Sequence, residues 1–233
     1  MKLRVGTSGF AYREWLGKFY PPGLGTRQML PFYANRFSSV EINATFYRMP
    51  APTVLESWRS QVPEEFVFTF KAPGLITHRQ RLRNAEETTA AFTTRVSALG
   101  RQLGPVLFQL PPYLPCNLPL LADFLAPLTR IRAAFEFRHP SWFNDQVYTV
   151  LRERSCALCL ADHDGAPPPP FIATTDFGYL RLRRGNYTDS ELQGWKRQLA
   201  AAGWGETFVF FRHEETARGP ALASRMERLD PVR

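Results

Sequence analysis

Short apolar runs alternate with helical patterns along the whole chain, and this alternation constrains the fold more than any other feature. The runs are rich in Val, Ile, Phe, Leu and Tyr and predict strands at residues 3–8, 38–46, 66–71, 105–110, 132–138, 156–162, 178–183 and 207–212. Helical periodicity is present near residues 26–37, 53–61, 85–102, 118–128, 144–154, 188–202 and 219–229. At two helix starts, Asn84 with Glu87 and Thr188 with Glu191 have the spacing of a capping box.

Eight strands alternating with helices in 233 residues predict an α/β fold, a single and slightly reduced TIM-like (β/α)8 barrel over residues 1–233. The sixth connection contains Pro167 to Pro170, which predicts a stiff extended connector in place of a crossover helix. A doubly wound open sheet is the competing architecture. It is less favoured because Gly6-Thr7-Ser8-Gly9 lacks the third glycine of a dinucleotide-binding loop.

The chain is basic, with 29 Lys and Arg residues against 21 Asp and Glu residues and a formal net charge of +8. Only four of the basic residues are lysines, and the planar guanidinium of arginine suits phosphates and carboxylates. An anionic small molecule or a nucleic acid is therefore a candidate partner. The alternative is that the arginines, which are spread along the chain, lie on solvated helix faces.

The three cysteines do not predict a disulfide framework and fit a reducing compartment. Cys156 and Cys159 have C-x-x-C spacing, but residues i and i+3 of a strand point to opposite faces, so we expect core residues. No apolar run reaches the roughly 18 residues that a bilayer crossing needs. Residues 1–5 lead into a strand without a signal-peptide core. These features predict a cytoplasmic protein with no membrane segment.

Polar residues stand at several predicted strand ends, which form the mouth of a (β/α)8 barrel, where active sites are built. In the second run, period-2 alternation predicts that Glu41, Asn43, Thr45 and Tyr47 share one inward face. The candidate catalytic residues are Glu41, Glu136, Lys71 and His78. The candidate substrate-binding residues are Tyr12, Trp15, Asn43, Thr45, Tyr47, Gln109, Arg138, His139, Trp142, Asp162, Arg181 and Arg183.

The later strands carry charges that need partners. Glu136 and Arg138 share one strand face, and Arg181 and Arg183 share another. An unpaired buried charge costs several kcal/mol. The Glu136–Arg138 pair is therefore either a structural ion pair or a site that a ligand completes. The eighth run ends in a further charged cluster, His213-Glu214-Glu215.

A set of short motifs occurs in order along the first two thirds of the chain. The motifs are Gly6-Thr7-Ser8-Gly9-Phe10 with Tyr12 and Trp15, Phe19-Tyr20-Pro21, Val40-Glu41-Ile42-Asn43 with Thr45-Phe46-Tyr47-Arg48, Lys71-Ala72-Pro73 with Thr77-His78, Phe108-Gln109-Leu110-Pro111-Pro112, and Glu136-Phe137-Arg138-His139 with Ser141-Trp142. In these motifs the chain resembles the YecE-like family (domain of unknown function 72). The resemblance implies a TIM-barrel-like fold and no established activity.

The last third departs from the family pattern. Similar proteins tend to have Arg-Leu-His-Gly on the seventh strand, where this chain has Arg181-Leu182-Arg183-Arg184. They tend to end the eighth strand with Phe-Asn-Asn-Asp, where this chain has Phe211-Arg212-His213-Glu214. The added arginines make the predicted mouth more basic.

Three functions remain open on these residues. The first is a hydrolase-like enzyme acting on a phosphate-containing substrate, a nucleic acid or a sugar phosphate, with arginines holding phosphate and a carboxylate as general base. The second is a glycosidase-like enzyme that uses Glu41 and Glu136 as paired carboxylates. The third is a non-catalytic ligand- or nucleic-acid-binding protein. No His-x-His or His-Glu-x-x-His motif is present, so a metal enzyme is less favoured, although Asp162, His163, His139 and the glutamates could converge. The sequence identifies no particular cofactor.

Overall fold

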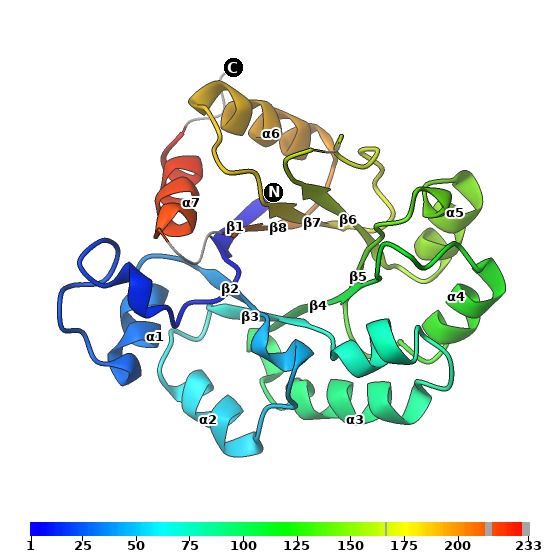
Figure 1. Cartoon of the computed structure of the whole chain (residues 1–233), viewed down its shortest axis with the longest axis horizontal. Coiled ribbons are helices and arrows are strands. Elements are labelled where there is room, and N and C mark those ends of the chain that lie inside the picture. Colours follow the sequence, from blue (N-terminus) through cyan, green and yellow to red (C-terminus); the bar gives the residue numbers. More distant parts are fainter. Residues whose placement is uncertain (166, 213–215, 230–233) are drawn as a thin grey trace.

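The computed structural model describes residues 1–165, 167–212 and 216–229, in which eight parallel strands form a nearly closed barrel. The strands are β1 (Lys2–Thr7), β2 (Ser39–Ile42), β3 (Val67–Lys71), β4 (Leu103–Gln109), β5 (Ala133–Glu136), β6 (Ala157–Asp162), β7 (Phe177–Leu182) and β8 (Glu206–Phe211). The helices around them are α1 (Thr26–Ala34), α2 (Pro52–Ser60), α3 (Glu86–Ser97), α4 (Leu118–Leu125), α5 (Asp145–Glu153), α6 (Asp189–Ala201) and α7 (Arg218–Arg228) (Figure 1). The predicted TIM-like (β/α)8 architecture is confirmed.

The connection between β6 and β7 differs from the others because it has no crossover helix. Residues 163–165 and 167–176 contain neither helix nor strand, and Pro167 to Pro170 lie within this segment. Proline has no backbone N–H to donate, so the segment cannot continue a helix or a central strand. The predicted proline-rich connector is confirmed.

The barrel closes between β1 and β2 through few backbone contacts. The strand order is β1-β8-β7-β6-β5-β4-β3-β2, so β1 and β2 are the two ends of the hydrogen-bonded sheet. A single parallel bridge joins Ser8 to Glu41 beyond the end of β1, and the Gly9 N–H donates to the Glu41 carbonyl at 2.8 Å. The two end strands are therefore hydrogen-bonded to each other at the mouth through the backbone of Glu41, whose side chain is a buried charge.

Lower on this seam, a tyrosine side chain replaces part of the backbone ladder. The Tyr33 hydroxyl from α1 accepts from the Thr7 N–H at 2.8 Å and donates to the Ser39 carbonyl at 3.1 Å. Gly6 lies at the same place, and a Cβ built there would stand 2.0 Å from the Ser39 carbonyl oxygen. Glycine is required here because the two backbones approach so closely.

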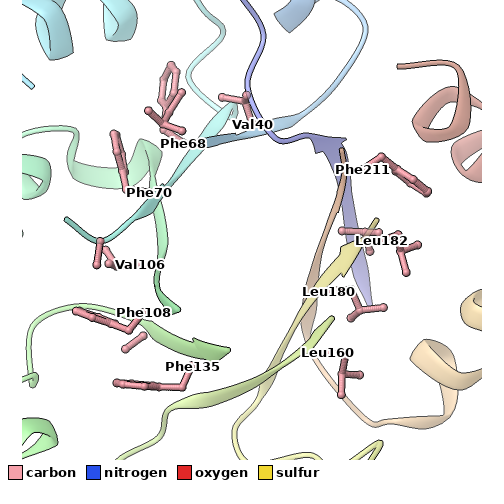
Figure 2. Close-up of a cluster of buried hydrophobic side chains, with 14 of the residues drawn as sticks. Val40, Phe68, Phe70, Val106, Phe108, Phe135, Leu160, Leu180, Leu182 and Phe211 are labelled. Carbon is pink, nitrogen blue, oxygen red and sulfur yellow. The ribbon is translucent and has the colours of Figure 1, made fainter. Parts of the chain in front are cut away.

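Alternate strand residues face the helices and the barrel interior, as the period of a strand requires. The outward set packs under the helices and includes Val40, Phe68, Phe70, Val106, Phe108, Phe135, Leu160, Leu180, Leu182 and Phe211 (Figure 2). The inward set fills the middle of the barrel and consists of Val67, Leu107, Ala134, Ala157, Cys159, Phe177, Tyr179, Phe208 and Phe210. Burying one such large side chain contributes about 1.5–3 kcal/mol. Cys156 belongs to the outward set and Cys159 to the inward set, which confirms both as core residues on opposite faces.

The two predicted capping boxes differ in outcome. At α6, the Thr188 hydroxyl accepts from the Glu191 N–H, and the Glu191 carboxylate accepts from the Thr188 N–H, as predicted. At α3, the prediction from Asn84 and Glu87 is wrong, because the N-cap is Ala85 and no side chain caps the helix. Asn84 instead has a left-handed backbone with φ of 48°.

None of the helices in the described residues combines the length and the apolar composition that a membrane crossing requires.

Candidate functional site

The centre of the barrel mouth is an arginine held between two carboxylates. Arg181 of β7 donates from Nη2 to Glu41 Oε1 at 2.7 Å and from Nη1 to Glu136 Oε2 at 2.6 Å. Glu41 comes from β2 and Glu136 from β5, and none of the three side chains is more than 5% exposed. The glycosidase-like alternative paired these two carboxylates from the sequence. The structure adds the guanidinium that joins them.

Glu41 accepts hydrogen bonds from four side-chain donors. Its Oε1 accepts from the Ser8 hydroxyl at 2.7 Å and from Asn43 Nδ2 at 3.3 Å, and its Oε2 accepts from the Tyr179 hydroxyl at 2.7 Å. Together with Arg181, these donors fix the carboxylate in one position. A group held in this way supports its neighbours and has little freedom to take a proton from a substrate.

Glu136 is kept ionised by its partners. Its Oε1 accepts from Gln109 Nε2 at 2.6 Å, on the neighbouring strand β4. Burial alone would raise the pKa of Glu136, but the charge and hydrogen bond of Arg181, and then the Gln109 amide, lower that pKa below its usual value. A general acid at neutral pH needs a raised pKa. Glu136 is therefore unsuited to the acid role of a glycosidase.

Lys71 at the end of β3 is a half-buried amine without a carboxylate in contact. Its Nζ lies 4.1 Å from the centre of the Phe46 ring, a cation–π geometry. No ion pair joins it to another of the described residues. Burial, followed by the nearby charge of Arg181, lowers the pKa of Lys71 to about 8. The amine can therefore donate or accept a proton near neutral pH.

His78 also contacts Phe46 and lies in the π-helical turn η3 (Leu75–Arg79) that follows β3. Its ring meets the Phe46 ring edge to face with centroids 4.9 Å apart, and Nδ1 lies 2.9 Å from the Thr77 hydroxyl. Burial and the positive charge of Lys71 lower the pKa of His78. The imidazole is therefore neutral at pH 7, as a general base must be.

Two further arginines of the mouth have unsatisfied hydrogen-bonding capacity. Arg183 places Nη2 3.6 Å from Glu41 Oε1, but its buried Nε and Nη2 find no hydrogen-bond acceptor within the described residues. Arg138 is exposed and makes no ion pair or side-chain hydrogen bond with the described parts of the chain. The cation that pairs with Glu136 is therefore Arg181 and not Arg138.

The second strand is shorter than predicted, which changes the positions of three candidates. The strand β2 ends at Ile42, and η2 (Ala44–Phe46) follows as a 3-10 turn. The predicted shared face is therefore wrong beyond Asn43, which alone contacts Glu41. Thr45 is buried and donates to the Lys71 carbonyl at 2.7 Å, whereas Tyr47 is 86% exposed on the outside of the turn.

Several aromatic candidates form part of the core. Trp15 and Trp142 are each 1% exposed, and Trp142 stacks on Phe137 with ring centres 4.6 Å apart. Tyr12 is half-buried and donates to the Ser8 carbonyl at 2.9 Å. Their contact with a substrate stays a prediction, which burial makes less favourable for the two indoles.

The remaining polar candidates lie away from the central arginine. Asp162 at the end of β6 pairs with Arg184 at 3.0 Å, and Arg184 also pairs with Glu191 at 2.8 Å. His139 places Nδ1 2.8 Å from the Ser141 hydroxyl in η5 (Pro140–Trp142). The cluster expected from His213, Glu214 and Glu215 lies outside the described residues.

Three residues of the site were not among the sequence candidates. Tyr179 could have been found, because it alternates with Arg181 on the same face of β7. Ser8 lies within a motif of the first strand, yet no pattern connects it to Glu41. Phe46 had no signal of its own, because an apolar residue on a predicted strand is ordinarily a core residue.

Among the described residues, no group of three or more His, Cys, Asp or Glu side chains gathers in a way that could hold a metal ion.

The described part of the mouth offers more hydrogen-bond donors and cations than acceptors. Within the described residues, Arg181, Arg183 and Lys71 face two carboxylates, Glu41 and Glu136, so the charge of this set is positive. An anion is the kind of ligand that such a site attracts.

Comparison with known proteins supports the fold. The family described as "Protein of unknown function DUF72" matches residues 4–231. UPF0759 protein YecE of Escherichia coli strain K12 is 39% identical over 113 residues, which are 48% of this chain and 42% of the relative. UPF0759 protein YunF of Bacillus subtilis strain 168 is 26% identical over 230 residues, which are 91% of this chain and 79% of the relative. The match to YecE thus spans less than half of that relative's length.

Two solved structures have the same architecture. A DUF72 family protein from Thermotoga maritima superposes with a TM-score of 0.86 at 27% identity, covering 98% of both chains. A DUF72 family protein from Enterococcus faecalis superposes with a TM-score of 0.79 at 20% identity, covering 97% of this chain and 94% of the other. The second similarity concerns the fold alone.

Proposed function

We propose that this chain, which belongs to the DUF72 family of proteins of unknown function, binds a phosphate-containing substrate at the barrel mouth and hydrolyses its phosphoester bond. The observation that carries the proposal is the surplus of cations above the Glu41–Arg181–Glu136 cluster. Lys71 has no carboxylate partner, and the buried Nε and Nη2 of Arg183 have no acceptor among the described residues. A phosphate group supplies the missing negative charge and acceptors.

Binding is assigned to Arg183, Lys71 and the exposed Arg138. A guanidinium presents paired N–H groups that match two phosphate oxygens, and an ammonium adds a compact charge. Both carboxylates below are hydrogen-bonded to Arg181, and Glu41 approaches Arg183 only at 3.6 Å, beyond hydrogen-bond distance. Their role is to hold Arg181 and the strands β2, β5 and β7 in place.

The chemical step is assigned to His78 and Lys71, which both contact the Phe46 ring. The neutral imidazole of His78 takes a proton from a water molecule, whose oxygen attacks the phosphorus atom. The ester P–O bond then breaks, and the Lys71 ammonium gives its proton to the departing alkoxide. The pKa of Lys71 is about 8 and that of His78 is below its usual value, so at pH 7 the amine is protonated and the imidazole is neutral, as these roles require.

The glycosidase-like alternative has less support. It needs one carboxylic acid to protonate a leaving group, whereas Arg181 and Gln109 keep the pKa of Glu136 low and Glu41 accepts from four donors. The non-catalytic alternative uses the same cations and is separated from the hydrolase by experiment. A cytoplasmic location belongs to this proposal, because the three cysteines are free thiols.

The test uses p-nitrophenyl phosphate and bis(p-nitrophenyl) phosphate as substrates and isothermal titration with inorganic phosphate. We expect Lys71→Met to weaken phosphate binding and to lower turnover of an alkyl phosphate ester about 10²–10⁴-fold, the range of a lost general acid, with a smaller loss for the p-nitrophenyl esters, whose phenolate leaves without a proton. His78→Asn should lower turnover by a similar factor and leave phosphate affinity nearly unchanged. Lys2→Met, an exposed lysine at the opposite end of the barrel, is the matched control.

Two results would contradict the proposal in different ways. Phosphate binding without turnover of either ester would replace the hydrolase with the non-catalytic alternative. Failure of phosphate to bind, with Lys71→Met behaving as Lys2→Met does, would remove the anion site itself.

A further inference from the structure

We infer that the substrate is a single-stranded nucleic acid, which lies along a basic rim beside the mouth. The basic rim consists of residues 43–51, 72–85, 110–117 and 137–144, the segments that follow β2, β3, β4 and β5. The inference rests on the proposed function, because it places a phosphodiester of the strand against Lys71 and His78.

The charge of the basic rim has one sign. Its four segments contain no Asp and no Glu, and they carry Arg48, Arg79, Arg81, Arg83 and Arg138. All five arginines are exposed. The other side of the mouth differs, because Asp162 and Glu191 there neutralise Arg184. A polyanion is therefore attracted to the β2–β5 half of the mouth.

The basic rim also exposes large apolar side chains, which a soluble chain ordinarily buries. Tyr47 is 86% exposed, Tyr113 59% and Leu75 44%, and they come from three successive segments after β2, β4 and β3. Exposed tyrosines interleaved with arginines are the composition on which unpaired bases stack while their phosphates meet cations. Duplex bases are already stacked on each other, so this surface favours a single strand.

The stacking residue Tyr47 contacts Phe46, and Phe46 contacts both proposed catalytic residues. The Tyr47 ring lies 5.1 Å from Phe46, whose other neighbours are Lys71 and His78. At the far end, the Arg81 guanidinium lies 5.3 Å from the centre of the Tyr113 ring. A groove of about 480 Å³ is lined by residues that include Tyr47, Arg48, Leu75, His78 and Arg79. A strand in this groove passes His78 and Phe46, and Phe46 carries Lys71 against its ring.

The backbone of the basic rim is held in conformations that cost free energy. Arg81, Leu82 and Asn84 have φ of 51°, 68° and 48°, in the left-handed region that residues with a side chain rarely adopt. The turn before them is π-helical, a form that often occurs at functional sites. Such strain persists where the surrounding structure enforces it, and it is concentrated at binding and catalytic sites. Here it directs Arg81 onto Tyr113.

The experiment measures fluorescence anisotropy of 5′-labelled dT10 and rU10 with the full chain. We expect binding that weakens with salt, with a slope of log K against log salt of about 0.7 for each phosphate contacted. Tyr47→Ala and Tyr113→Ala should each weaken binding roughly tenfold, and Tyr47→Phe should retain it. Arg79→Ala should reduce the salt slope. Arg101→Ala, an exposed arginine at the opposite end of the barrel in η4 (Gly100–Gln102), should leave it unchanged.

The outcomes separate this inference from the proposed function. Turnover of p-nitrophenyl esters without binding of either oligonucleotide would overturn the inference and leave the hydrolase intact. Equal affinity for the single strand, its duplex and polyglutamate would also overturn it, because that pattern is charge attraction alone. Binding that is insensitive to Tyr47→Ala and Tyr113→Ala would overturn the stacking surface.

Discussion

At the scale of single residues, Arg181 is the side chain on which the mouth depends. It neutralises two carboxylates that are almost completely buried, and its own side chain is 1% exposed. Removing one partner of a buried ion pair leaves an uncompensated charge, which costs about 3–5 kcal/mol. Ion pairs nearer the surface contribute far less.

We therefore expect Arg181→Met to lower the free energy of unfolding at pH 7 by about 3–5 kcal/mol, measured by urea denaturation. Arg132→Met is the control, because Arg132 is partly exposed and its partner Glu206 keeps Arg4; it should cost about 1 kcal/mol or less. Equal effects of the two substitutions would contradict the central role of Arg181.

The pH dependence gives a second check on the same variant. In the wild type, burial raises and Arg181 lowers the pKa of Glu136, with a net lowering. This group therefore stabilises the fold above its unfolded pKa of about 4.3, and that stabilisation is lost as pH falls through the folded value. Without Arg181, burial alone remains and Glu136 takes up a proton at higher pH. The cost of Arg181→Met should thus shrink between pH 7 and pH 5.

At the scale of elements, the two capping-box patterns give a direct comparison. Thr188→Ala removes a hydroxyl that caps α6, and we expect a loss of about 1 kcal/mol in the free energy of unfolding. Glu87→Ala should cost less than about 0.5 kcal/mol, because Glu87 is exposed and contributes only its charge near the start of α3. Thermal unfolding of both variants tests this, and a larger loss for Glu87→Ala would show that α3 is capped after all.

Sequence periodicity predicted the elements well and the connections between them less well. Alternation identified Arg181 and Glu41 as inward residues because both lie within strands. The predicted alternation is wrong at Thr45 and Tyr47, where a 3-10 turn follows the strand. Local apolar content does not distinguish the end of a strand from a tight turn. The capping prediction at Asn84 is wrong because its backbone is left-handed, as are those of Arg81 and Leu82 in the segment before α3. Local sequence spacing does not predict that conformation.

The sequence could not predict which charged residues form ion pairs across the barrel. Glu136 and Arg138 share a predicted strand face, and the sequence left open whether they form an ion pair or a ligand site. The partner is instead Arg181, 45 residues away, because closure of the barrel brings β5 and β7 to the same mouth. Residue type also did not show which aromatic side chains are exposed for a ligand and which are packed in the core. Trp15 and Trp142 are core residues, whereas Tyr47 is exposed.

At the scale of the whole molecule, net charge and the position of Lys71 determine how the protein responds to pH. The formal charge of +8 is partly gathered on one half of the mouth, where burial and the charge of Arg181 lower the pKa of Lys71. An anion bound there favours the protonated amine. Stability and ligand binding are therefore linked through the same proton.

The unfolded chain holds the Lys71 proton up to a pKa of about 10.4, whereas the folded chain releases it near a pKa of about 8. Between these values the unfolded state binds more protons, so the free energy of unfolding rises with pH relative to a variant without the amine. From pH 7.5 to pH 10 we expect wild type to gain about 1–2 kcal/mol over Lys71→Met in urea unfolding, after allowance for solvent screening. Saturating phosphate should reduce this gain, because it retains the proton on the folded state. A difference that is independent of pH with and without phosphate would mean that Lys71 titrates as a free lysine and that the anion binds elsewhere.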